Sequence, residues 1–192
     1  EVTLQPLERG AWDSGPQLRC IADRYISSHG LAEAARCYAR AVQLLPDDAL
    51  LWHSHAASLL SFGDTAGSEA AIDRAIALDP MLANSWYFRS TLRRQTASDN
   101  HVSELRAMLA RMPKRGQAAL HYALAKELED LGNHPAAFMH MSQGAAIRRQ
   151  GMSYEVSADV QIMAAIRATF DATWRQGCAP GNARPDAIFG LY

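Results

Sequence analysis

The chain has 192 residues, of which 48% are hydrophobic, a share typical of a folded globular protein and too high for general disorder. Its 19 Lys and Arg residues nearly balance its 20 Asp and Glu residues, which leaves a net charge of −1. No overall electrostatic field therefore favours nucleic acid or an acidic membrane surface, and we expect neither as a partner.

Cysteine usage and the lack of a long apolar run bear on the compartment. Cys20, Cys37 and Cys178 are an odd number without the spacing of a disulfide framework, which is typical of reduced thiols. No apolar run approaches the roughly 20 residues that a bilayer requires, and the first residues lack the pattern of a secretion signal. These features predict a cytoplasmic location, although a start at Glu1 leaves upstream processing open.

The pattern along the chain predicts an all-α fold. Ala, Leu and Glu are plentiful, and strict alternation of Val, Ile and Thr is absent until the last few residues. Segments of about 10 to 15 residues with helical period are separated by turn residues, as in antiparallel helices joined by short turns. The turn residues are Gly30, Pro46, Gly63, Pro80, Pro113, Gly132, Pro135 and Gly151.

An internal repeat joins these helices. The stretch AVQLLPDDALLW, from Ala41 to Trp52, returns as AIALDPMLANSW, from Ala75 to Trp86, with Ala, Leu, Pro, Ala and Trp each displaced by 34 residues. This pattern resembles the tetratricopeptide repeat, a pair of helices with an early Trp, a small residue four later, a turn Gly, two spaced Ala and a final Pro. The resemblance implies a right-handed superhelix of about four helical hairpins.

The four units match this pattern to different degrees. The first runs from about Ala22 to Pro46, and the second, from Trp52 to Pro80, departs only at Ser68, where Ala is usual. The third opens with Trp86 and Ser90, then has Arg93 at an apolar position and no turn Gly, so we expect it to be degenerate. The fourth matches at Leu124, Ala125, Leu128, Gly132, Ala137 and Gly144.

Close packing of paired helices explains the pattern. Small side chains at Ala22, Ala56 and Ala125 let the first helix of a pair, helix A, approach the second, helix B, while Trp52 and Trp86 fill the remaining space. One pair cannot bury both of its faces, so stacked neighbours supply the missing partner.

A last helix and a tail follow the repeats. An apolar stripe from Ser153 to Gly177 predicts a long helix that closes the stack, with Ser153 as its N-cap. The stripe consists of Val156, Val160, Met163, Ile166, Phe170 and Trp174. We therefore expect a repeat domain over 1–175 and an irregular tail over 176–192, whose apolar end, Ile188 to Tyr192, suggests self-association with another copy.

A narrower resemblance covers roughly Asn100 to Gly190. The stretches HYALAKELEDLGNHPAAFMHMSQGAAIRRQ and FDATWRQGCAPGNARPDAIFG are similar to bacterial proteins in which tetratricopeptide helices precede a sulfotransferase domain. In that family the segment after the Arg-Pro pair, here Arg184 and Pro185, becomes the first catalytic strand, and a phosphate loop then holds the sulfate donor. No position here matches that loop, so we expect no catalytic residue and no cofactor.

The histidines and the charge clusters favour structural interpretations. The spacing of His53 and His55, and of His121, His134 and His140, lacks the i, i+4 geometry of a helical ligand pair, so we expect ordinary imidazoles and no metal. We interpret Glu127, Glu129 and Asp130, which adjoin Lys126, as a solvated helix face. Arg148 and Arg149 fit the last turn of a helix, where cations favour the dipole.

The concave surface formed by the A helices is the best candidate site. In the repeat family a fixed set of helix A positions lines the ligand groove, and these positions map here onto Arg19, Asp23, Leu50, His53, Ala57, Asn84, Tyr87, Thr91, Arg94, Tyr122, Lys126 and Glu129. We expect Arg19, His53, Asn84, Tyr87, Arg94, Tyr122 and Lys126 to bind a peptide, because aromatic and cationic side chains are common interface anchors. The Lys and Asn pairs that clamp a C-terminal carboxylate in some members are missing.

Two functions follow. The first is a non-catalytic interaction module that binds a protein or peptide across the A helices. The alternative is the regulatory or substrate-presenting part of a sulfotransferase whose catalytic domain is absent from this chain.

Overall fold

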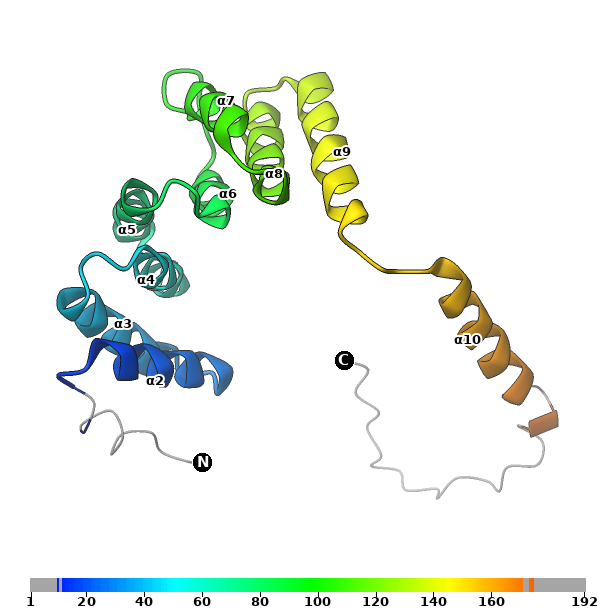
Figure 1. Ribbon diagram of the computed structural model, residues 1–192, viewed down its shortest axis with the longest axis horizontal. Helices are drawn as coiled ribbons and strands as arrows, with labels where there is room; N and C mark the ends of the chain where they lie inside the picture. Colours follow the sequence, from blue (N-terminus) through cyan, green and yellow to red (C-terminus); the bar gives the residue numbers. More distant parts are fainter. Residues whose placement is uncertain (1–9, 11, 171–172, 175–192) are drawn as a thin grey trace, which may run out of the picture. The chain divides into compact units, whose positions relative to one another are not determined.

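The computed structural model describes residues 10, 12–170 and 173–174, and their regular elements are helices (Figure 1). Within these residues the only β pairing is one isolated bridge between Thr96 and Asp99. Contacts between Cα atoms divide the chain into two units, Glu1–Gly151 and Met152–Tyr192. The expected boundary between 175 and 176, and the tail after it, lie outside the described residues.

The first of these two compact units is a row of helical hairpins. Its helices are α2 Gly15–Ser27, α3 Leu31–Leu44, α4 Ala49–Ser61, α5 Thr65–Leu78, α6 Ala83–Thr91, α7 Val102–Arg111, α8 Lys114–Asp130 and α9 His134–Gln150. The two helices of a hairpin pack on each other in α2–α3, α4–α5 and α8–α9, and successive hairpins meet through α3–α4, α5–α6 and α7–α8. The all-α tetratricopeptide solenoid is therefore confirmed.

Local capping explains where several helices start and stop. The carboxylate of Asp48 accepts a hydrogen bond from the backbone N–H of Leu51 at 2.9 Å, and Asp64 caps α5 in the same way through Gly67. Gly63 and Gly132, in the turns of the second and fourth hairpins, have φ values of 77° and 76°. A side chain would strain the backbone there, which favours glycine, although His29 holds a φ of 62° in the turn of the first hairpin.

The two repeated tryptophans occupy equivalent places. The indole Nε1 of Trp52 donates to the carbonyl oxygen of Pro46 at 2.8 Å, and Nε1 of Trp86 donates to that of Pro80 at 3.0 Å. Each indole thus ties the start of an A helix to the turn that ends the preceding hairpin. The 34-residue repeat in the sequence is therefore also a repeat in the structure.

Small residues lie where the helices cross. Ala22, Ala34, Ala56 and Ala75 have no exposed surface. Ser68, which replaces the usual Ala, is equally buried, and its hydroxyl donates to the carbonyl oxygen of Ala56 at 2.8 Å. A polar residue is tolerated at this crossing because its hydrogen bond is satisfied across the hairpin.

The third repeat of the row is irregular, as the sequence indicates. Helix α6 has only nine residues, and the segment from Leu92 to His101 separates it from α7. Arg93, at the position expected to be apolar, instead forms ion pairs with Glu69 at 3.1 Å and Asp99 at 2.8 Å.

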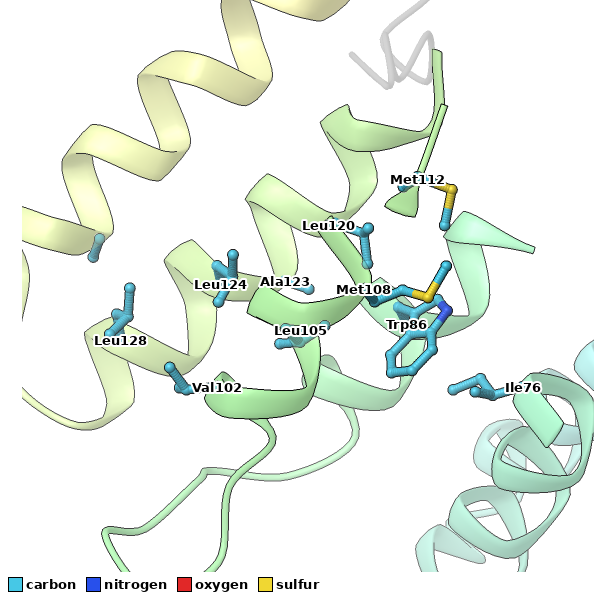
Figure 2. Close-up of a cluster of buried hydrophobic side chains, with 11 residues drawn as sticks. Ile76, Trp86, Val102, Leu105, Met108, Met112, Leu120, Ala123, Leu124 and Leu128 are labelled. Carbon is cyan, nitrogen blue, oxygen red and sulfur yellow. The ribbon is translucent and has the colours of Figure 1, made fainter. Parts of the chain in front are cut away.

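A buried apolar cluster joins this irregular unit to its neighbours. Figure 2 shows Trp86 beside Met108, with Leu105, Leu120 and Leu124 continuing along the same core. These side chains come from α6, α7 and α8, so the third and fourth units share one core.

The second of the two compact units contains helix α10, Val156–Thr169. It begins after Glu155, so the prediction of Ser153 as N-cap is wrong, and the side chain of Glu155 makes no capping hydrogen bond. The stripe is exposed, from 49% at Trp174 to 70% at Met163, and closure of the stack by this helix stays a prediction. In the part of the chain that the structure covers, no helix has both the length and the apolarity needed to cross a membrane.

A matched pair of substitutions in α5 tests the packing argument. Ala75→Leu adds bulk at a fully buried crossing, whereas Ala70→Leu adds the same bulk to the exposed side of the same helix. We expect Ala75→Leu to lower the free energy of unfolding by about 1–3 kcal/mol. We expect Ala70→Leu to change it by less than about 0.5 kcal/mol. Urea denaturation followed by circular dichroism gives both values, and equal effects would contradict close packing at this crossing.

Candidate functional site

The candidate residues lie mainly on the A helices α2, α4, α6 and α8. In Figure 1, α4 and α6 lie toward the inner side of the curved row of hairpins, while α5 and α7 lie on its outer side. Arg19 belongs to α2, His53 to α4, and Tyr122 and Lys126 to α8, as expected. Arg94 is not on helix A as predicted, because α6 ends at Thr91 and Arg94 falls in the segment that follows.

Two tyrosines form the aromatic centre of this surface. The rings of Tyr87 and Tyr122 meet edge to face, with centroids 6.3 Å apart. Tyr87 is 42% exposed and Tyr122 half-buried, so the pair is accessible to a partner. The ring of Tyr122 lies close to Gly144 of α9, where an added Cβ would be 3.0 Å from Tyr122 Cε1.

His53 connects the second hairpin to the third. Its Nδ1 lies 2.9 Å from Ser85 Oγ, and its ring packs on Phe88 with centroids 5.4 Å apart. Burial lowers the pKa of His53 below its ordinary value, so the imidazole is neutral near pH 7. Within the candidate set, His53 positions α6 and contributes no positive charge.

Lys126 is engaged by its own surroundings. Its Nζ lies 2.5 Å from Asp130 Oδ2 and also donates to the backbone carbonyl of Arg93. Burial acts to raise the pKa of Asp130, but the backbone N–H of Gln95 and the Lys126 ammonium outweigh it and hold that pKa below its ordinary value. Lys126 therefore fastens the segment after α6 to α8.

Arg19 is likewise paired. Its guanidinium lies 3.3 Å from Asp48, the residue that caps α4. Next to it, Tyr38 donates a hydrogen bond to Asp23 at 2.5 Å, and burial together with this bond raises the pKa of Tyr38. The polar side chains at the N-terminal end of the surface are therefore engaged within the scaffold.

Arg94 and Asn84 remain accessible. Both are exposed, and no residue in the described ranges forms a hydrogen bond or ion pair with either side chain. Arg94 acts on Asp130 only through its electrostatic field. Of the seven candidates, these two side chains and the tyrosine pair offer the most uncommitted binding capacity.

A buried carboxylate, missed in the sequence, supports this surface from below. Glu127 is fully buried, so its interpretation as part of a solvated face is wrong. Ser90 Oγ donates to it at 2.6 Å, the backbone N–H of His101 at 2.7 Å, and His101 Nδ1 lies 3.0 Å away. Burial acts to raise its pKa, but the bonds from His101 and Ser90 prevail and lower it, so the group stays ionised. The one feature of the sequence that points to this buried carboxylate is Ser90, a polar residue at the small-residue position of helix A.

A buried arginine holds the outer side of α6. Arg89 is 6% exposed and pairs with Asp73 of α5 at 3.1 Å and with Glu104 of α7 at 2.6 Å. Its guanidinium carbon lies 4.9 Å from the centre of the Trp86 ring, within the range of a cation–π interaction. Arg89 thus joins α5, α6 and α7.

The histidine pattern differs from that of a metal centre. His121 and His140 are both 8% exposed, and their Nδ1 atoms lie 2.9 Å apart. In the described part of the chain no group of three or more His, Cys, Asp or Glu side chains is placed to hold a metal ion.

A cavity lies away from these residues. It has a volume of about 320 Å³ and is lined by side chains of α5, α6 and α7 that include Ile76, Trp86, Met108 and Arg111. None of the seven candidates lines it. This cavity is therefore separate from the candidate surface on the A helices.

These features define the class: a helical repeat scaffold whose A helices present an aromatic and polar face. No protein-family model matches the chain, and no curated protein matches it. Among solved structures, a crystal structure of MamA is similar with a TM-score of 0.60 and 12% identity, over 78% of this chain and 87% of that one.

Two further solved structures are similar. A second MamA crystal structure gives a TM-score of 0.55 and 13% identity, over 79% of this chain and 82% of that one. The TPR2B domain of yeast Sti1, in its complex with pHsp70, gives 0.42 and 16%, over 71% and 97%. At these identities the likeness concerns the fold alone.

Substitution of Glu127 tests the buried network. Glu127→Ala leaves the Ser90 hydroxyl and the His101 N–H without their acceptor, and we expect it to lower the free energy of unfolding by about 2–4 kcal/mol. Glu129→Ala, at an exposed position two residues away, is expected to have an effect below about 0.5 kcal/mol. Urea denaturation at pH 7 measures both, and similar losses would show that the network contributes nothing specific.

Proposed function

We propose that this chain is a non-catalytic interaction module that binds an extended polypeptide across its A helices. The observation that carries the proposal is the accessible Tyr87–Tyr122 pair, to which Arg94, in the segment after α6, adds an uncommitted cation. Tyrosine provides a large contact area with few rotatable bonds, and arginine provides directed hydrogen bonds, so both are common energetic anchors of interfaces.

The support beneath the surface favours binding with little rearrangement. Ser85 holds His53, Ser90 holds Glu127, and Lys126 holds the segment that carries Arg94. These bonds link α4, α6, α8 and the segment after α6, and so hold in place the elements that carry Tyr87, Tyr122 and Arg94. A surface that is already ordered loses less conformational entropy when a partner binds.

Charge indicates which part of a partner binds. Asp48 pairs with Arg19, and the His53 imidazole is held neutral by burial, so neither of these two candidates offers a free cation for a chain terminus. Arg94 supplies positive charge at the other half. We therefore propose that the occupant is an internal segment with an apolar or aromatic residue next to a carboxylate, rather than a free C-terminus.

The double substitution Tyr87→Ala/Arg94→Ala tests the site. Peptides are selected on the wild-type chain from a phage-displayed random library, and their affinities for each variant are measured by fluorescence anisotropy. We expect the dissociation constant to rise at least about thirtyfold, since two anchors contribute about 2 kcal/mol or more together. The unfolding midpoint should stay unchanged, because both side chains are exposed.

The matched control removes an aromatic ring and an arginine from another surface. Phe138 and Arg148 lie on α9, and both are exposed. Phe138→Ala/Arg148→Ala should leave the affinity within about twofold of wild type. Equal losses in both double variants would remove the A-helix surface from the proposal.

The alternative is a regulatory or substrate-presenting role in a sulfotransferase. Its support is the sequence likeness over roughly Asn100 to Gly190. The reading frame that continues from Tyr192 tests it: a strand followed by a phosphate-binding loop would favour this role, and an immediate stop codon would contradict it. A cytoplasmic location and self-association through Ile188 to Tyr192 also stay proposals, and light scattering with and without that segment tests the latter.

A further inference from the structure

A buried pair of histidines joins the last two helices of the first unit. His121 of α8 and His140 of α9 are each 8% exposed, with ring centroids 5.2 Å apart and planes inclined by 36°. Their Nδ1 atoms, 2.9 Å apart, are within hydrogen-bond distance. Such a bond needs an N–H on one ring and a lone pair on the other, so at least one imidazole must be neutral.

The surroundings offer no counter-charge for a second proton. The charge that reaches the pair from α7 is the cation Arg106. On α8, Glu127 is bound to Ser90 and His101, and Asp130 to Lys126; on α6, Arg89 is bound to Asp73 and Glu104. Among the described residues no carboxylate forms an ion pair with either imidazole. Two protonated rings would therefore repel each other in a buried site.

The same helix contact supports the tyrosine pair. Gly144 follows His140 by one turn of α9, and a Cβ added there would lie 3.0 Å from Tyr122 Cε1 and 3.2 Å from both His121 Cβ and the carbonyl oxygen of Ala118. The backbone of α9 therefore lies directly against Tyr122. Separation of α9 from α8 would remove the support of that ring.

We propose that His121 and His140 form a pH-sensitive latch that holds α9 against α8 and thereby keeps Tyr122 in place for binding. Acidification charges both imidazoles, breaks their hydrogen bond and loosens the hairpin. The effect on binding rests on the proposed function, whereas the loosening of the hairpin does not.

The direction of the pH effect follows from linkage. Burial lowers the pKa of His121, and burial, the charge of His121 and Arg106 lower that of His140. Because both pKa values are lower in the folded state, the stabilisation is complete above the unfolded value of about 6.5 and is lost as pH falls below it. Glu127 stays ionised in this range because its own pKa is lowered.

Amide hydrogen exchange on the full chain tests the latch without a ligand. Between about pH 7.5 and about pH 5, after correction for intrinsic rates, we expect protection in α8 and α9 to fall at least about tenfold more than in α2 and α3. His121→Asn/His140→Asn places a non-titrating amide where each Nδ1 lies, so it should abolish this difference. His134→Asn, at the exposed first residue of α9, should preserve it.

Three outcomes would overturn the latch. The first is equal protection at both pH values, and the second is an equal loss of protection in the Asn double variant. If that variant does not fold, the third is an NMR titration of the wild type in which both imidazoles show the ordinary pKa of about 6.5.

Binding at low pH separates the latch from the proposed function. For a library-selected peptide that binds at about pH 7.5, we expect weaker affinity at about pH 5 in the wild type and little change in the Asn double variant. Hairpin loosening without loss of affinity would overturn the control of Tyr122. A library that yields no binder at either pH would contradict the proposed function, and the exchange result would still decide the latch.

Discussion

The fold depends on one constraint: a helical hairpin has two faces to bury and can bury only one within itself. Successive hairpins therefore have to meet at a fixed angle and spacing. The hydrogen bonds from Trp52 to Pro46 and from Trp86 to Pro80 fix that relation twice, because each joins an A helix to the preceding turn. Buried alanines such as Ala56 allow the helices to come close enough for the indoles to fill what remains.

The third unit shows what happens when this pattern weakens. Helix α6 has nine residues and no turn glycine follows it, and charged side chains make several of the contacts around it. Arg93, in the segment after α6, pairs with Glu69 and Asp99, and the buried side chains of Arg89 and Glu127 each bond to two residues outside their own helix. Such buried charges cost desolvation energy, yet their directional bonds admit few alternative arrangements. This irregular region also carries Tyr87 and Arg94, so the least regular repeat presents the most distinctive surface.

The sequence predicted the repeats because their signals are local and periodic. Gly, Pro, Ala and Trp act within a turn or between helices 34 residues apart, and one register captures them all. The bonds of Glu127 are different, since its partners Ser90 and His101 come from earlier elements and share no period with it. The pairing of His121 with His140, 19 residues apart, likewise depends on how α8 faces α9. Such contacts arise from tertiary packing, which a linear pattern does not specify.

The charges of the candidate surface show why its composition alone overstated its capacity to bind a ligand. The sequence predicted that Arg19 and Lys126 bind a peptide, but Asp48 and Asp130 engage these two cations. An ion pair within the scaffold has to be broken, or shared, before either partner can bind a ligand, and that cost reduces its contribution to affinity. What remains is a tyrosine pair and one exposed guanidinium held on a stiff frame. Specificity at such a surface then depends on how the frame positions the two rings, and the packing of α9 behind Tyr122 becomes part of the site.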